Sequence, residues 1–208
     1  MKKIFTTVLA ALLAAAALWA QTPEEIIARM EKETARFDPE GFSMVMEIKI
    51  PILGTMGTTA YIFGDKYKMI TNAMGATITQ WSDKTTTWEY DSSKDEITVS
   101  NANPTQESQA DSNVEMLKGV TNGYDVRLQK ETDTAWHFRC TKSRTNTNKD
   151  DPRTMELVVA KSSYLPVSLK ASTKGVTVTL RDFAVGIGEE EVTFRASDYP
   201  TATIVDKR

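Results

Sequence analysis

The chain has 208 residues, and 25 Lys and Arg stand against 28 Asp and Glu, which gives a formal net charge of −3. That length suffices for one domain with a sizeable hydrophobic core. The acidic balance excludes the positive field on which nucleic-acid binding depends. One His and one Cys supply no ligand set for zinc, copper or iron, so we expect neither a metal nor another cofactor.

Residues 1–20 have the composition of a secretory signal peptide. Lys2 and Lys3 precede an apolar run from Ile4 to Leu18, and small residues lead to a cleavage position after Ala20. A transmembrane anchor would need roughly 20 apolar residues, and the polar QTPEE begins too early for that. The residue after the cut is not a cysteine, so lipid attachment there is excluded. We therefore expect residues 21–208 to be one soluble exported domain with a formal charge of −5, since cleavage removes two lysines and no acidic residue.

An amphipathic helix is predicted directly after this segment. Thr22, Pro23 and Glu25 fit the N-cap, first position and third position of a capping box. Apolar residues then recur at helical spacing up to Phe37, and charged residues fill the opposite side. The helix is predicted to end at Asp38-Pro39 and Gly41, and its apolar stripe must pack on something.

The hydrophobic period changes to two after Gly41, which predicts strands. Tight turns connect them, which predicts antiparallel pairing. A Pro-containing loop and a short helix are predicted between 101 and 119. The fold class is therefore mainly β (α+β), and the predicted strands are 42–50, 59–63, 66–71, 76–81, 85–90 and 96–100 before that helix, and 124–131, 134–140, 154–160, 165–171, 175–183 and 191–195 after it.

No catalytic constellation is visible. The sequence lacks a G-x-S-x-G elbow, a phosphate-binding loop and an HExxH motif. Cys140 shares a strand face with Trp136 and Phe138, so a small buried hydrophobe explains it better than a reactive thiol. We therefore expect a protein that is not an enzyme and has no catalytic residues.

The stretch WSDKTTTWEYDSSKDEITVS, residues 81–100, contains two apolar pairs, Trp88/Tyr90 and Ile97/Val99, each on one strand face. That face could contact a sealed core, a sugar or nucleic-acid ligand, or an apolar ligand. Methionines crowd the first group of strands, and Met adapts to irregular space and varied partners. Gap-filling in a β-core and a pocket for acyl chains both remain open on composition alone.

Several stretches, in their order along the chain, resemble the LolA family of periplasmic outer-membrane lipoprotein carriers, in the form found in Bacteroidetes-like bacteria. They are AYIFGDKYKMI, ITQWSDKTTTWEYDSSKDEITV, YLPVSLKA and FAVGIGEEEVTFRASDYPTATIVDKR. The resemblance covers residues 22–208. It implies an incomplete, strongly curved antiparallel β-barrel of about eleven strands with a helical lid.

The resemblance also implies the roles of particular residues. Apolar side chains of two helices would form the lid, and they are Ile26, Ile27, Met30, Phe37, Met116 and Leu117. Apolar strand residues would line the hydrophobic cavity or pack beneath it, and they are Met44, Met46, Ile48, Tyr67, Met69, Trp88, Tyr90, Trp136, Phe138, Leu157, Val159, Val167 and Leu169. The sequence alone does not distinguish the residues of the cavity wall from those of the sealed core.

The function that the resemblance implies is a carrier that shields lipoprotein acyl chains between the inner and outer membranes. Its transient partners would be an inner-membrane lipoprotein exporter and an outer-membrane acceptor, and it would act as a monomer. A lipid or lipoprotein sensor of the same fold, which does not transfer cargo, is the alternative, because fold alone does not fix function. One feature departs from the family: IFGDKYK, residues 62–68, contains no counterpart of the early-strand arginine that ties barrel to lid.

Overall fold

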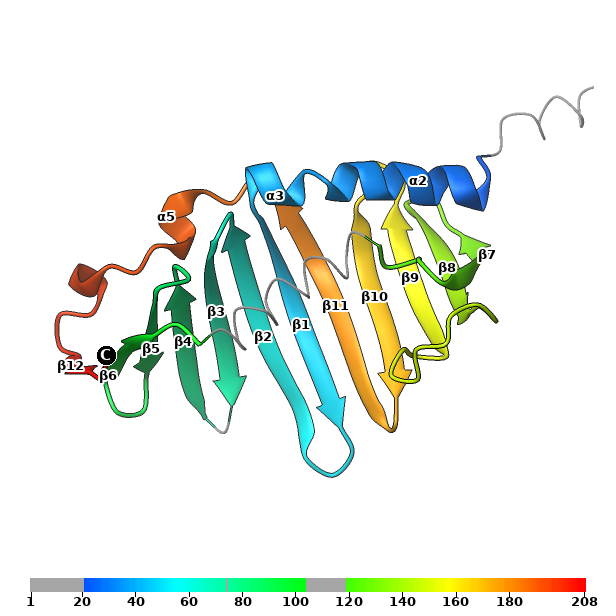
Figure 1. The fold of residues 1–208 in the computed structure, drawn as a ribbon. Coiled ribbons are helices and arrows are strands. Elements are labelled where there is room, and N and C mark those ends of the chain that lie inside the picture. The colour runs from blue at the N-terminus through cyan, green and yellow to red at the C-terminus, as the bar shows by residue number, and fades with distance from the viewer. Residues whose placement is uncertain (1–20, 74, 104–118) are drawn as a thin grey trace, which may run out of the picture.

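A 12-stranded sheet forms most of the part of the chain that this computed structural model describes, residues 21–73, 75–103 and 119–208 (Figure 1). The sheet is curved and unclosed, as the family resemblance implied. Its strands are β1 (Phe42–Ile50), β2 (Gly54–Phe63), β3 (Lys66–Ala73), β4 (Ala76–Ser82), β5 (Thr86–Asp91), β6 (Glu96–Asn101), β7 (Tyr124–Glu131), β8 (Ala135–Lys142), β9 (Thr154–Ala160), β10 (Pro166–Thr173), β11 (Val176–Val185) and β12 (Thr203–Asp206).

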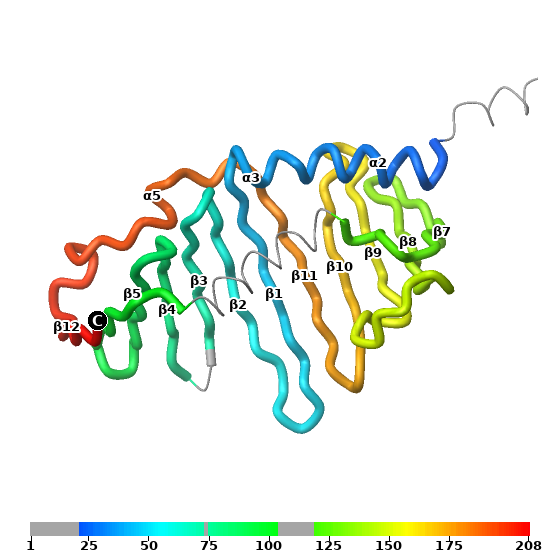
Figure 2. The backbone as a smooth tube through the Cα atoms, viewed as in Figure 1, coloured from blue at the N-terminus to red at the C-terminus, as the bar shows by residue number. Residues whose placement is uncertain are grey.

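Two antiparallel meanders, β1 to β6 and β7 to β11, join side by side through the pairing of β1 with β11. The order across the sheet is β12-β6-β5-β4-β3-β2-β1-β11-β10-β9-β8-β7, so its two ends are β12 and β7. β12 was not predicted, and it runs parallel to β6, its neighbour in the sheet. The chain terminus therefore lies against a strand more than 100 residues away in sequence (Figure 2).

The predicted strand 191–195 is wrong. Residues Glu189–Val192 form a short helix, α5, and a 3-10 helix, η1 (Ala196–Asp198), follows it. Three glutamates occupy the first turn of α5, where the helix dipole favours negative charge. The alternation of Val192 and Phe194 thus reflects a chain that leaves the sheet and packs over it.

The helix predicted after the N-terminal segment is present as α2 (Pro23–Thr34), followed by α3 (Phe37–Glu40). Both hydrogen bonds of the capping box form: Glu25 N donates to Thr22 Oγ1, and Thr22 N donates to the Glu25 carboxylate. Gly41 then connects α3 to β1 with φ of +67°, and a Cβ there would meet Ile187 O at 2.6 Å. Only glycine fits this position without displacing its neighbours.

The proposed signal peptide, 1–20, and the predicted second helix with Met116 and Leu117 lie outside the described residues. Within the described ranges, no helix combines the length and the apolar character needed to span a bilayer.

Candidate functional site

The two faces of the sheet differ in what covers them. α2 packs on the face of the sheet to which Phe42 and Met44 of β1 point. We call this face the inner face and the opposite face the outer face. Residues paired directly across an antiparallel ladder share a face. The register Met46↔Leu180, Leu180↔Leu169 and Leu169↔Leu157 therefore carries one apolar row across β1, β11, β10 and β9.

A cavity of about 620 Å³ lies on this inner face. Strands β1, β9, β10 and β11 form one wall, and residues 119–124 and 151–152 contribute the rest. Most of its lining is aliphatic or thioether side chain, and the lining residues are Met46, Ile48, Gly119, Val120, Asn122, Tyr124, Asp151, Pro152, Met155, Leu169, Ala171, Thr173, Val176, Val178 and Leu180. Its size falls in the range of small-molecule sites, about 300–1,000 Å³.

Two of the polar groups at this cavity have partners of their own. The hydroxyl of Tyr124 donates to Pro152 O at 3.1 Å, and burial raises the pKa of that phenol. The Asp151 carboxylate accepts hydrogen bonds from the side-chain amides of Asn146 and Asn148 at 2.8 and 2.7 Å. A ligand would therefore find an apolar wall with few competing polar contacts.

A sealed core lies beneath α2 and α3, beside the cavity. Ile26, Ile27, Met30 and Phe37 are all buried there, and the Phe37 and Phe42 rings stack with centroids 4.5 Å apart. Five sequence-predicted cavity residues belong to this core and do not line the cavity: Met44, Trp136, Phe138, Leu157 and Val159. The predicted lid stripe thus packs tightly on the sheet, and its role as a lid remains a prediction.

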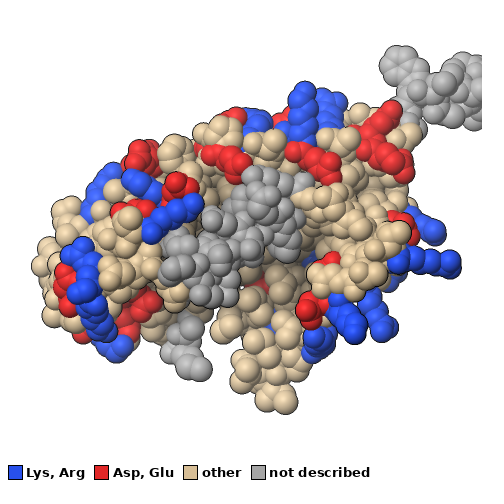
Figure 3. All heavy atoms as spheres, viewed as in Figure 1, with Lys and Arg blue, Asp and Glu red and all other residues tan. Residues whose placement is uncertain are grey.

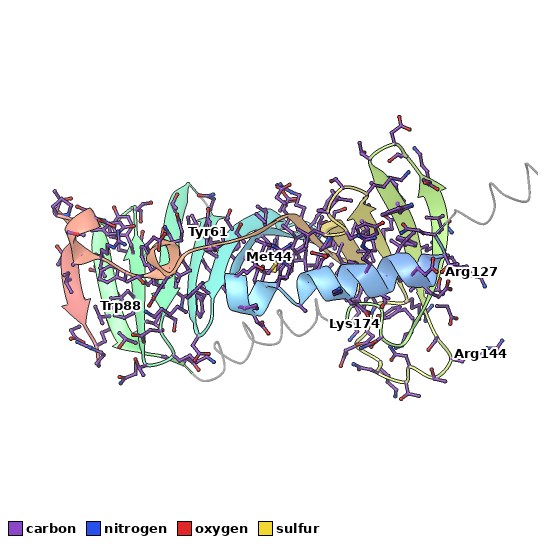
Figure 4. All side chains as sticks on the ribbon, turned by 90° about the horizontal axis from the view of Figure 1, so that it is seen from above. Met44, Tyr61, Trp88, Arg127, Arg144 and Lys174 are labelled. Carbon is purple, nitrogen blue, oxygen red and sulfur yellow. The ribbon has the colours of Figure 1, made fainter. Side chains whose placement is uncertain are left out.

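Trp88 and Tyr90 require a correction, because the ladder puts them on the outer face. Met44 pairs with Ala60, Ala60 with Met69, Met69 with Gln80, and Gln80 with Glu89, so Glu89 shares the inner face and its neighbours do not. From above, Met44 lies beside the helices and Trp88 at the far end, next to the C-terminal segment (Figure 4). These two aromatic residues do not line the cavity.

The C-terminal segment covers this outer aromatic surface. The Phe194 ring stacks on Trp88, with ring centroids 5.3 Å apart, and meets Trp81 edge-on, with centroids 5.4 Å apart. The ring centroids of Tyr199 and Tyr90 are 4.5 Å apart. The Tyr90 hydroxyl donates to Asp95 at 3.1 Å. The apolar side of the sheet therefore changes from the inner face in β1–β3 to the outer face in β4–β6, and the protein has two separate cores.

Comparison with known proteins gives fold-level similarity only. No family model and no curated protein matches the chain. Among solved structures, lipoprotein LppX of Mycobacterium tuberculosis aligns with a TM-score of 0.50 and 9% identity, over 77% of this chain and 94% of that chain. The fold is like that of this lipoprotein. A LolA superfamily protein of Nitrosomonas europaea aligns over 86% of this chain and 100% of its own, with 12% identity and a TM-score of 0.35.

A conserved protein of Thermus thermophilus aligns at 14% identity over 90% of this chain and 100% of its own, with a TM-score of 0.45. Identities this low show similarity of fold alone and leave the activity open. The Bacteroidetes type remains a prediction.

Of the sequence-predicted cavity residues, three line the cavity: Met46, Ile48 and Leu169. Tyr67 is buried on the inner face, where it pairs with Ile62, and Met69 packs partly buried against the core. Val167 falls in a β-bulge of β10 and is 44% exposed, so it lines nothing. The bulge shifts the alternation by one residue, which the sequence did not reveal.

Several lining residues were missed although a signal for them existed. Met155 has the same parity as Leu157 and Val159, Ala171 that of Leu169, and Val178 and Leu180 alternate in GVTVTLRDF. The same period-two argument that selected their neighbours would have found them. Val120 carried no such signal, because it lies outside any strand and is buried by tertiary contacts.

Two side-chain contacts attach α2 to turns beside the sheet. The Arg29 guanidinium lies 4.1 Å from the centroid of the Tyr164 ring, at the β9–β10 turn, and the Thr121 hydroxyl donates to Glu31 at 3.1 Å. These contacts join the helix to the half of the sheet that contains β7 to β10, whereas residues 62–68 lie at the β2–β3 turn in the other half. Cation–π contacts at exposed sites contribute about 0.5–1 kcal/mol.

No group of three or more His, Cys, Asp or Glu side chains in the described ranges is arranged to hold a metal ion. Burial raises the pKa of the Cys140 thiol to about 11, which keeps it protonated and unreactive near neutral pH.

Proposed function

We propose that this protein binds the acyl chains of lipoproteins in the inner-face cavity and carries them across the periplasm. In this proposal residues 1–20 are a cleaved signal peptide and residues 21–208 form the soluble carrier domain. An inner-membrane exporter supplies the lipoprotein and an outer-membrane acceptor receives it. No covalent chemistry is needed, because transfer exchanges one set of hydrophobic contacts for another.

The observation that carries the proposal is the cavity of about 620 Å³ and its aliphatic wall. Removing a methylene from water gains about 0.8 kcal/mol, so several acyl chains free in water would be prohibitive and a lined cavity prevents that exposure. A packed β-protein of this size has few voids larger than a water molecule. A cavity this large and apolar therefore favours an apolar ligand over a structural role.

The first test is saturable binding of a fluorescent fatty acid to the exported protein. Ala171→Phe adds a ring at the cavity wall and should weaken binding at least tenfold. The matched control is Thr179→Phe, because Thr179 pairs with Lys170 and Glu47 and so lies on the outer face of the neighbouring strand. Equal affinities for the two variants would contradict the cavity as the binding site.

The second test separates a carrier from a sensor of the same fold. Membranes carrying a triacylated lipoprotein are incubated with the protein, and lipoprotein in the supernatant is measured. A carrier releases it in proportion to added protein, and Ala171→Phe abolishes the release. Fatty-acid binding without release would favour the sensor.

A further inference from the structure

The β1–β2 hairpin projects beyond the other turns at its edge of the sheet and carries an apolar tip (Figures 1 and 2). Pro51, Ile52 and Leu53 form the turn, and residues Ile52 and Leu53 are 105% and 78% exposed. Met56, on the same hairpin, is 43% exposed. Three of the six large hydrophobic residues that are exposed in the described part of the chain thus belong to one hairpin.

Folding does not explain this tip. Ile52 has φ of +73°, in the left-handed region, where a β-branched side chain is strained and glycine or asparagine is the ordinary choice. The side chain also makes no use of burial, since it is fully exposed. Both its conformation and its exposure oppose stability, and residues of this kind concentrate at functional sites.

The tip is continuous with the cavity. Met56 pairs with Ile48, which lines the cavity, and Ile48 pairs with Val178 on its other side, also a lining residue. The adjacent β10–β11 turn is close: a Cβ on Gly175 would lie 3.5 Å from Pro51 Cγ, and the next residue, Val176, lines the cavity. An apolar track therefore runs from the hairpin tip to the cavity wall.

Positive charge flanks the apolar tip. Lys49 precedes it on β1, and Lys174 stands on the adjacent turn with 76% of its side chain exposed, where it pairs with the exposed Asp150 at 3.2 Å. Figure 3 shows the end of the projecting hairpin free of charged atoms, with Lys and Arg atoms beside it. An apolar end with basic neighbours is the pattern of segments that insert at the surface of a membrane with anionic lipids.

We propose that the β1–β2 tip docks on a lipid bilayer, with Ile52 and Leu53 inserted at the interface and Lys49 and Lys174 at the headgroups. A stable protein interface takes about 20–30 residues a side, which a convex tip of a few residues does not provide, whereas interfacial insertion needs only such a tip. Docked in this way, the tip brings the cavity end that carries Ile48 and Val176 to the membrane. This last step rests on the proposed function, and the docking itself does not.

The test is flotation of the exported protein with phosphatidylcholine vesicles, with and without phosphatidylglycerol. Ile52→Asn combined with Leu53→Ser should lower the partition coefficient on the order of 100-fold, without loss of thermal stability, because asparagine suits a positive φ. The matched control, Val167→Ser with Ile204→Ser, removes two other exposed aliphatic side chains and should bind vesicles as the wild type does. Lys49→Gln with Lys174→Gln should weaken binding only where phosphatidylglycerol is present.

The outcomes that overturn the docking proposal are distinct from those that overturn the proposed function. If the tip variant still binds vesicles, docking is overturned. If the wild type is a dimer and the tip variant is a monomer, docking is also overturned, and the tip instead contacts another copy of this chain. Fatty-acid binding without vesicles should be unchanged in the tip variant. A wild type that docks on vesicles but binds no fatty acid would sustain the docking and overturn the carrier.

Discussion

The inner-face and outer-face cores are separate, and the variant Phe194→Ala tests this separation. Phe194 is half-buried and contacts both Trp81 and Trp88 on the outer face. A fully buried Phe→Ala change costs about 3–5 kcal/mol, and aromatic pairs add about 0.5–1.5 kcal/mol to their area of contact. Because the ring is only partly buried, we expect the free energy of unfolding to fall by less than for a fully buried ring, about 2 kcal/mol.

The assay has two readouts. Thermal unfolding should begin roughly 4–8 °C lower, given about 2–4 °C per kcal/mol for a chain of this length. The affinity for a fluorescent fatty acid, measured well below the transition, should stay within about twofold of the wild type, because the cavity lies on the other face. Leu180→Ala, at a buried residue that lines the cavity, should lower both stability and affinity. A tenfold loss of affinity in Phe194→Ala would refute the two-core description.

Other predictions concern positions with a matched control or a clear direction. Gly41→Ala should destabilise the protein more than Gly64→Ala in chemical denaturation: both have positive φ, +67° and +55°, but only the first would have backbone atoms within 3 Å of the new Cβ. Arg29→Gln should lower the free energy of unfolding by about 0.5–1 kcal/mol through its contact with Tyr164, and an unchanged midpoint would contradict that contact. The Cys140 thiol, with its pKa raised to about 11, should react with a thiol reagent far more slowly in the native chain than in urea. Since the unfolded thiol ionises near its ordinary pKa of about 8.5, Cys140 should make the native state progressively less stable as pH rises from there to about 11.

The fold was largely predictable because its strands are short, alternate cleanly and are separated by turn residues. The spans 42–50, 124–131 and 154–160 agree residue for residue with β1, β7 and β9. α2 was predictable from its capping box and apolar stripe. β12 was not, because four residues near the terminus become a strand only through pairing with β6, a contact distant in sequence.

The candidate site was less predictable, because period-two alternation gives the parity of a residue and not which face of the sheet it occupies. For Trp88 and Tyr90 the parity was right, but their face became clear only through the pairing of β5 with β4. Which of the inner-face residues line the cavity also depends on how the helices pack on the sheet. Met44 and Met46 alternate identically, yet the first is buried in the core and the second lines the cavity.

The most direct test of the central claim is a crystal structure of the protein with a fatty acid brominated at the end of its chain. We expect an anomalous bromine peak on the inner face, against Met46, Val178 and Leu180. A peak on the outer face near Trp88, or crystals that take up no bromine at saturating fatty acid, would contradict it.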